Sequence, residues 1–371
     1  MRKIRHSAPW RGRFNLQYAP VIGELPALIR LQAFRSTPIA SPSSVLIVNC
    51  CLIGDFVVSL PSITDFIREH PNAEIDLLVS PTVAPLAQRI RGVRRVYVAR
   101  SVFGRETELD DLDTSLASYY DLVIVLRLSG PARRLLARTS YRAARTYLVP
   151  LLRYSLQLIR RPVTEARQLS ELNFEVFGKP GKNVRHLRVD DALDLSGAPS
   201  VPGWPGRTVV VHTGSGSRFY KWPLQKWHTL LKNLHELGDV SFVFVGGGDE
   251  ERRSFEALAT RASFTLHSVI GRYDLLQVLM LMRVSALFVG VDSGPRHLAH
   301  LVDLPSVSLL GPGPKSFQPL NYNATVIDET ECKKCFTLYC PHSPNCIEKI
   351  EVARVAAVCR NILLSRASRP A

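Results

Sequence analysis

The sequence lacks a long apolar segment. Nowhere in its 371 residues do about 18 apolar residues follow one another, the length that a helix needs to cross a bilayer. The most apolar window, LLQVLMLMRVSALFVGV, is interrupted by Arg283. The basic N-terminus precedes a stretch that Pro20, Glu24, Pro26 and Arg30 interrupt, so it has no signal-peptide apolar core. These absences predict a cytoplasmic protein and exclude a membrane-spanning one.

Two common nucleotide motifs are also absent. No G-x-x-x-x-G-K-S/T occurs, which argues against a P-loop nucleotidase. No G-x-G-x-x-G follows an apolar run with an acidic residue at the expected distance, which argues against a dinucleotide oxidoreductase. A site for a nucleotide must therefore be of another kind.

Acidic residues are few relative to basic ones. Lys and Arg total 47 against 32 for Asp and Glu, a formal charge of +15 that favours an anionic partner. Nucleic acid, phospholipid and phosphorylated glycan would all meet this requirement. No nucleic-acid module and no interleaved aromatic stripe occur, so we expect no nucleic-acid partner. Residues 1–40, with seven basic side chains against Glu24, form either a segment on an anionic membrane surface or a solvated tail.

Apolar runs and helical segments alternate in two rounds along the chain. Runs at 44–50, 73–80, 93–100 and 120–127 predict four buried strands, with a helix at 57–69 after the first. A second round begins at Thr208. This is the βαβ pattern of a doubly wound parallel sheet, and the length suits two domains. We predict an α/β protein with an N-terminal extension (1–40), a first domain (41–184), a linker (185–206), a second domain (207–350) and a C-terminal helix and tail (351–371).

The stretch from Leu287 to Leu310 organises the second round. A buried strand runs into Asp292-Ser293-Gly294, which opens a short helix before another strand. Asp292 or Ser293 can cap this helix, and the unpaired N–H groups of its first turn can bind an anion such as phosphate. Earlier glycine turns at 214–216 and 246–248 also follow strands. In a parallel sheet all three turns lie at the carboxyl edge, where ligands bind.

Three stretches together resemble a known family. They are IGDFVVSLPSITDFIREHPNAEIDLLVS, HTGSGSRFYKWPLQKW and VDSGPRHLAHLVDLPSVSLLGPG, and they resemble, in order and spacing, the signature regions of glycosyltransferase family nine, the heptosyltransferases of lipopolysaccharide synthesis. The resemblance covers nearly all of the chain after residue 44. It implies a GT-B fold of two Rossmann-like domains facing across a cleft. The first would bind a lipopolysaccharide core acceptor at the inner face of the inner membrane, and the second ADP-heptose or a related nucleotide sugar.

The resemblance also implies a catalytic base. Asp55 matches the glycine-aspartate that serves as base in the family, where a carboxylate takes the proton of an acceptor hydroxyl as it attacks the sugar. An N-cap of a helix beginning near Val57 is the alternative role for Asp55. The implied reaction is an inverting single displacement that requires no metal cofactor.

The second domain is expected to bind the donor. Positions that match the family's phosphate contacts are Thr213, Ser215, Ser293, Gly294 and His297, and Glu250 matches the acid that contacts the ribose. Asp292 is a further candidate residue of the donor site. The family usually has Lys two positions before the Trp-Pro pair, but this chain has Tyr220 there. We assign the phosphate-binding cation to Lys221, with Arg218 as the alternative. Another nucleotide sugar or acceptor, or a non-catalytic sugar-nucleotide-binding protein, are the alternative functions.

Arginines cluster after the fourth predicted strand. They are Arg127, Arg133, Arg134, Arg138, Arg142 and Arg145, and we expect those after the strand to lie on helices. Arg suits a bidentate grip on phosphates and carboxylates, so Arg127 and Arg145 are the candidate acceptor contacts. An acidic pair, Asp111 and Asp113, is interpreted as a solvated loop and not as a metal site.

Cysteines concentrate in residues 332–346. Cys332, Cys335, Cys340 and Cys346 form a C-x-x-C pair with two further cysteines, which is compatible with a structural zinc site. Thiols in a reducing compartment and disulfides are the alternatives.

Overall fold

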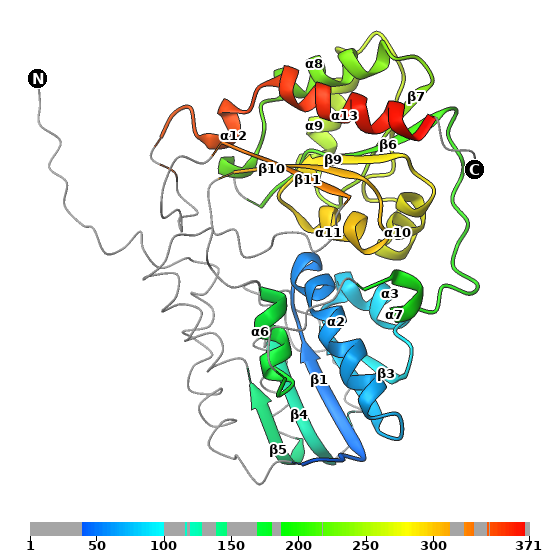
Figure 1. Cartoon of the computed structure of the whole chain (residues 1–371), viewed down its shortest axis with the longest axis vertical. Coiled ribbons are helices and arrows are strands. Elements are labelled where there is room, and N and C mark those ends of the chain that lie inside the picture. Colours follow the sequence, from blue (N-terminus) through cyan, green and yellow to red (C-terminus); the bar gives the residue numbers. More distant parts are fainter. Residues whose placement is uncertain are drawn as a thin grey trace, which may run out of the picture.

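The computed structural model describes residues 39–99, 116, 119–127, 139–146, 169–179, 187–216, 218–311, 323–329, 340 and 342–367. Two α/β domains lie one above the other along the long axis of the molecule (Figure 1). Each is built on a parallel sheet, so the predicted fold class is confirmed. No helix in the described part of the chain combines the length and apolar character of a membrane span.

The first domain contains a five-stranded parallel sheet within the described residues, in the order β3-β2-β1-β4-β5. Its strands are β1 (Ser44–Asn49), β2 (Glu74–Val79), β3 (Val93–Val98), β4 (Tyr119–Arg127) and β5 (Ser140–Thr146). The described helices of this domain are α2 (Ile53–Glu69), η2 (Pro81–Val83), α3 (Ala84–Ala87) and α6 (Leu169–Val176). The central strand β1 is apolar on both faces because helices or other core elements cover both, and Val45 to Val48 are fully buried.

Helix α2 begins four residues earlier than the sequence predicts. Its first residue is Ile53 and its N-cap is Leu52, so Asp55 lies inside the first turn. The interpretation of Asp55 as the cap of a helix starting near Val57 is therefore wrong. Buried side chains attach the helix to β1, since the Asn49 amide donates to the Ser59 hydroxyl at 2.8 Å.

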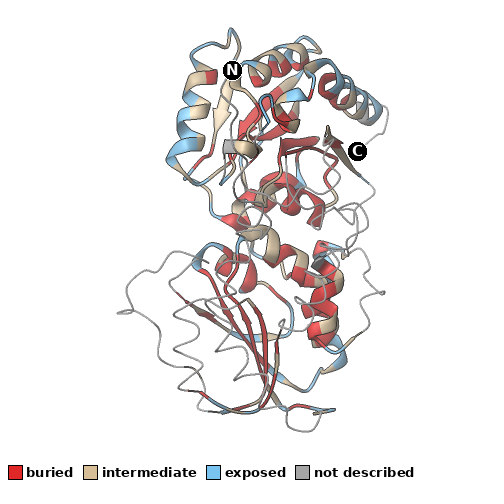
Figure 2. Cartoon of the chain, turned by 90° about the vertical axis from the view of Figure 1, so that its left-hand side faces the viewer, coloured by how far each residue is buried: buried red, intermediate tan, exposed pale blue. Residues whose placement is uncertain are grey.

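The second domain contains a six-stranded parallel sheet within the described residues, in the order β11-β10-β9-β6-β7-β8. Its strands are β6 (Arg207–His212), β7 (Val240–Phe244), β8 (Leu266–Ser268), β9 (Leu287–Val291), β10 (Ser306–Leu310) and β11 (Ala324–Asp328). Its described helices are η5 (Arg218–Tyr220), α8 (Leu224–His235), α9 (Asp249–Ala259), α10 (Leu275–Arg283), α11 (Gly294–Leu301), α12 (Cys346–Lys349) and α13 (Val352–Ala367). This is the strand order of a doubly wound dinucleotide-type sheet. In Figure 2 the central strands of both sheets are buried, whereas the helices expose their outer faces.

One strand replaces part of an expected helical region. Arg142 and Arg145 lie on β5, which pairs in parallel with β4 through Ala143 opposite Leu122. Ala143 and Ala144 are buried, so the small central residues pack against the core while the two arginines flank them. The prediction of helices at these two positions is wrong for that reason.

The segment predicted as a linker is partly packed on the first domain. It contains the short helix α7 (Val189–Ala192), and Ala192 and Leu193 are fully buried. Asp190 of this helix accepts from Arg283 of α10 at 2.5 Å. The segment therefore completes the first domain's core and contacts the second domain.

Candidate functional site

A cavity of about 730 Å³ lies between the two domains. The first domain lines it with residues that follow β1 and β2, and the second with residues that follow β6, β7, β8, β9 and β10. These are carboxyl ends of parallel strands, and the lining includes the points where strand order reverses, between β1 and β4 and between β6 and β9. Six residues proposed from the sequence line it: Asp55, Ser215, Asp292, Ser293, Gly294 and His297.

Two helix N-termini meet at this cavity, that of α2 from the first domain and that of α11 from the second. A Cβ on Gly294 would lie 2.7 Å from Ile53 Cβ, and a Cβ on Gly54 would lie 3.0 Å from His297 Cδ2. Real side chains do not pack at the first of these distances, so the two glycines allow the domains to approach here. The floor of the site is thus the contact between α2 and α11.

Asp55 is the carboxylate that the first domain presents to the cavity. Its side chain is 23% exposed, and its Oδ1 lies 3.4 Å from Nη2 of Arg127. Burial raises the pKa of Asp55, and the charge and hydrogen bond of Arg127 lower it, the burial effect being the larger. A carboxylate with a raised pKa is a stronger proton acceptor than an exposed one, which is the property that a general base needs.

The two arginines proposed as acceptor contacts have different surroundings. Arg127, at the end of β4, lies beside Asp55, and its Nη1 also donates to the Leu126 carbonyl at 3.0 Å. Arg145 donates through Nη1 to the Phe177 carbonyl at 2.6 Å, just beyond the end of α6. Neither is among the residues that line the cavity. Burial lowers the pKa of Arg145.

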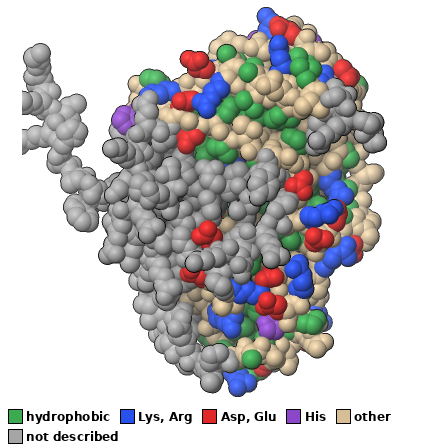
Figure 3. Space-filling model, viewed as in Figure 1, with side chains coloured by type: hydrophobic (Ala, Val, Ile, Leu, Met, Phe, Trp, Pro, Cys, Tyr) green, Lys and Arg blue, Asp and Glu red, His purple; other side chains and the backbone are tan. Residues whose placement is uncertain are grey.

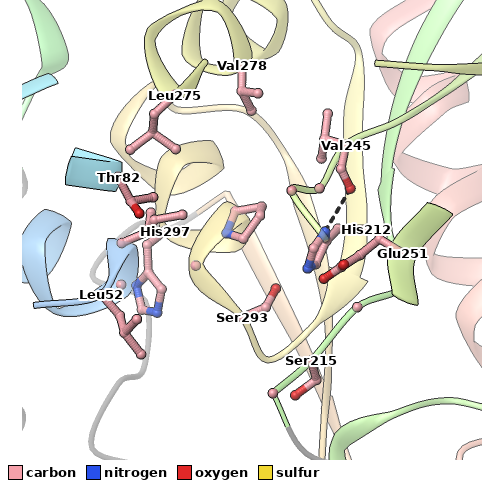
Figure 4. A pocket seen from close by; sticks show the side chains of 18 of the residues that line it. Leu52, Thr82, His212, Ser215, Val245, Glu251, Leu275, Val278, Ser293 and His297 are labelled. Atoms are coloured by element: carbon pink, nitrogen blue, oxygen red, sulfur yellow. Dashed lines mark hydrogen bonds between the residues drawn. The ribbon is translucent and has the colours of Figure 1, made fainter. Parts of the chain in front are cut away.

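The first turn of α11 is the part of the cavity lining best suited to bind an anion. Ser293, in an extended conformation, is the N-cap residue, and Gly294 is the first helical residue. The unpaired N–H groups of such a turn attract negative charge. Ser293 and His297 both border the space seen in Figure 4. Burial, followed by the charges of Arg296 and His300, lowers the pKa of His297 well below its usual value, so its imidazole is neutral at neutral pH.

The opposite wall holds two residues that the sequence did not single out, His212 and Glu251 (Figure 4). The Val245 carbonyl lies 2.9 Å from His212 Nδ1. Since a carbonyl only accepts, Nδ1 carries the proton, and Nε2 of this neutral ring is an acceptor. Burial lowers the pKa of His212.

Glu251 occupies space that glycines leave open. Its Oε2 accepts from the Gly248 N–H at 3.1 Å. A Cβ on Gly214 would lie 2.2 Å from its Oε1, so a side chain at that position would displace it. In the sequence, the glycines at 246–248 precede three acidic residues, Asp249, Glu250 and Glu251. This pattern indicates a ligand-binding turn but does not identify the acid that faces the cavity.

Three of the proposed donor contacts lie outside the lining. Lys221 and Glu250 form an ion pair with each other, and Thr213 is buried at the end of β6. The structure brings Tyr220 to the cavity in place of its neighbour Lys221. The side chain of Arg218 lies outside the described part of the structure.

Two further predictions fall largely outside the described residues. Cys332 and Cys335 are not described, whereas Cys340 is buried and Cys346 begins α12. The zinc site stays a prediction. The basic extension, of which residues 1–38 are not described, also stays a prediction as a membrane contact.

Comparison with known proteins identifies the family. The family model described as "Glycosyltransferase family 9 (heptosyltransferase)" matches residues 152–345, more than half of the chain. The chain belongs to glycosyltransferase family 9. The resemblance drawn from the three motifs is therefore confirmed, and the protein is a glycosyltransferase.

Individual members of family 9 align over most of this glycosyltransferase. Lipopolysaccharide heptosyltransferase 1 of Pseudomonas aeruginosa is 25% identical over 337 residues, which cover 81% of this chain and 88% of that protein. Lipopolysaccharide heptosyltransferase 3 of Escherichia coli is 22% identical over 283 residues, covering 70% of this chain and 80% of that protein.

Solved structures share the fold. ADP-heptose lps heptosyltransferase II of E. coli superposes with a TM-score of 0.63 at 16% identity, covering 88% of this chain and all of that one. E. coli heptosyltransferase WaaC with ADP-2-deoxy-2-fluoro heptose gives a TM-score of 0.63 at 18% identity, covering 86% of this chain and 99% of that one. The two-domain GT-B architecture of this family 9 enzyme is thereby confirmed.

The contact between α2 and α11 can be tested through its glycine. We expect Gly294→Ala to lower the free energy of unfolding by about 1–3 kcal/mol, because its methyl group would overlap Ile53. Gly216→Ala is the matched control, since it lines the same cavity and a Cβ there meets nothing within 4 Å. Denaturant unfolding followed by circular dichroism measures both. Equal stabilities for the two variants would contradict the contact.

Proposed function

We propose that this glycosyltransferase moves a heptose from ADP-heptose to the inner core of a lipid A-linked lipopolysaccharide acceptor, with inversion at the anomeric carbon and Asp55 as general base. The observation that supports this most is that a half-buried carboxylate from one domain and an anion-binding helix N-terminus from the other line the same cavity. A single displacement needs this pair, because one substrate loses a proton while the other releases a charged diphosphate.

The proposed reaction proceeds in one step. Asp55 takes the proton from an acceptor hydroxyl as its oxygen attacks the anomeric carbon of heptose. The bond from that carbon to the diphosphate oxygen breaks on the opposite face, and ADP leaves with the electron pair. The N–H groups of the first turn of α11, with His297 as a neutral donor, stabilise the charge that develops on the diphosphate.

The lining suggests how the nucleotide lies. Leu275 and Val278 stand together at one side of the cavity, whereas Ser293 and Ser215 lie at another (Figure 4). We assign the adenine to the apolar side and the diphosphate to the serine side, since a planar base favours apolar walls. Solved relatives contain ADP and ADP-2-deoxy-2-fluoro heptose, which supports this donor class.

The acceptor is proposed to enter beside Asp55. Arg127 is near enough to Asp55 to contact an acidic group on the acceptor, whereas Arg145 bonds to the chain after α6. On the face seen in Figure 3, described basic and acidic side chains are interspersed, so that part of the surface offers no single-sign patch to a membrane. Relatives named heptosyltransferase 1, 2 and 3 support the class of acceptor without selecting one linkage.

The first test is turnover by an Asp55→Asn variant. We expect kcat to fall about 10²–10⁴-fold, the usual contribution of a general base, with ADP-heptose binding unchanged. A coupled ADP-release assay with truncated lipopolysaccharide cores, including one without heptose, measures turnover, and calorimetry measures binding. Asp65→Asn, on the same helix and away from the cavity, is the control. Full activity of Asp55→Asn would refute the base role. Donor binding by the wild type without ADP release on any core would refute this acceptor class.

The pH profile tests the partnership of Asp55 and Arg127. Asp55 acts as a base only when ionised, so kcat/KM should fall as pH drops through its pKa. Because Arg127 lowers that pKa, Arg127→Met should move the acidic limb to higher pH. Arg145→Met should leave the limb in place, because Arg145 bonds to the Phe177 carbonyl and is not among the causes of the pKa shift of Asp55. An acidic limb that stays put, or moves to lower pH, in Arg127→Met would contradict the partnership.

Two adjacent acids compete for the role of ribose contact. Glu250 was assigned from the family match, but Glu251 lines the cavity, so we propose that Glu251 accepts from the ribose hydroxyls. Glu251→Gln should weaken ADP binding about tenfold, the loss of one charge-assisted hydrogen bond. Glu250→Gln should change it little, because its exposed pair with Lys221 contributes little. If calorimetry shows that Glu250→Gln weakens ADP binding more than Glu251→Gln does, Glu250 and not Glu251 is the ribose contact.

A further inference from the structure

A charged side chain is buried behind the anion-binding turn. Arg296, in the first turn of α11, is 1% exposed and does not line the cavity. A guanidinium is rarely buried unless it is paired, because leaving water is costly. It pairs with Asp292, whose Oδ1 lies 3.0 Å from Nη2, and with His297, whose Nε2 lies 3.4 Å from Nε. Both partners line the cavity although Arg296 does not.

The contact with His297 determines where that ring carries its proton. A guanidinium has only donors, so its Nε–H must donate to His297, and Nε2 must then be the unprotonated nitrogen. The backbone of α2 closes the same edge of the ring, since a Cβ on Gly54 would lie 3.2 Å from Nε2. Burial and the charge of Arg296 lower the pKa of His297, so the ring is neutral and has one proton. That proton is therefore on Nδ1.

The contact with Asp292 removes an obstacle to anion binding. Asp292 is 26% exposed and lies at the mouth of the α11 turn, where an unpaired carboxylate would repel a diphosphate. The ion pair with Arg296 neutralises it and ties it to the buried side of the turn. Arg296 thus sets the charge of Asp292 and the tautomer of His297, both of which line the cavity, although it does not line the cavity itself.

We infer that Arg296 is a positioning residue of the donor site, holding His297 as the Nδ1-protonated imidazole and neutralising Asp292 so that an anionic diphosphate meets donors at the α11 turn. The identity of the ligand rests on the proposed function, whereas the tautomer of His297 does not. The family motif places Asp, Ser, Gly and His at this turn, but no role was assigned to Arg296 from the sequence.

The tautomer is tested without activity. Full-length protein with ¹⁵N-labelled histidine gives long-range ¹H–¹⁵N spectra that distinguish the two tautomers, and a His297→Gln sample assigns the signal. The wild type should give the Nδ1–H pattern. Arg296→Met should shift His297 toward the Nε2–H form, and Arg283→Met, another ion-paired arginine of the same domain, should not. An unchanged pattern in Arg296→Met would overturn the inference.

Charge compensation tests the role of Asp292. Arg296→Met should weaken ADP binding at least about tenfold, measured by calorimetry, because an unpaired carboxylate then faces the diphosphate. Asp292→Asn combined with Arg296→Met should recover most of that loss, and a double variant no better than Arg296→Met would overturn this part. If Arg296→Met does not fold, the double variant, which leaves no buried charge unpaired, replaces it in the spectra, and its ADP binding is compared with that of the wild type. Binding within a few fold of the wild type is then expected, and a loss of tenfold or more would overturn the role of Asp292. Absence of ADP binding by the wild type would refute the proposed donor, while the spectra would still decide the tautomer.

Discussion

The site depends on one contact, the approach of the first turns of α2 and α11. Each helix follows a strand at the point where its sheet reverses order, and each turns its N-terminus toward the other domain. Gly294 leaves room for the side chain of Ile53, and Gly54 leaves room for the ring of His297. Two helix N-termini carry partial positive charge and repel each other mildly. An anion between them removes that repulsion, so a diphosphate would favour the same arrangement of domains that the glycines permit.

The same cavity holds a proton acceptor, Asp55, and a neutral hydrogen-bond donor, His297. Burial at the domain boundary raises the pKa of Asp55 and lowers the pKa of His297, because desolvation disfavours the charged form of each. The carboxylate becomes a better proton acceptor, and the imidazole stays neutral and donates a hydrogen bond. Arg127 opposes the rise in the pKa of Asp55, because its positive charge and its hydrogen bond favour the ionised carboxylate. Neither property belongs to the isolated residue, so both depend on the burial that the folded structure provides.

Much of this arrangement could be predicted from the sequence, where local signals agreed with the fold. The runs at β1 and β9 are apolar on both faces, and the glycines after β6, β7 and β9 indicated the ligand edge. Strand β5 could not be found, because two alanines between arginines give no strand pattern until β4 packs against them. The choice between Glu250 and Glu251 could not be made either. Adjacent residues of a helix point about 100° apart, and only the position of α9 decides which one faces the cavity.

Arg296 is a residue that the sequence analysis did not single out. Its sequence context, between Pro295 and His297 in a short helix, gives no sign of burial, since most arginines are exposed. The structure buries it instead, at a position where an apolar side chain would pack without a desolvation cost. A charged side chain in a buried position is unfavourable for stability, so a functional role is the simplest explanation for it. Its contacts with Asp292 and His297 both reach cavity residues, so the desolvation cost of burying this charge is linked to the turn that would bind the diphosphate. In return, the proton of His297 has a fixed position and the carboxylate of Asp292 is neutralised.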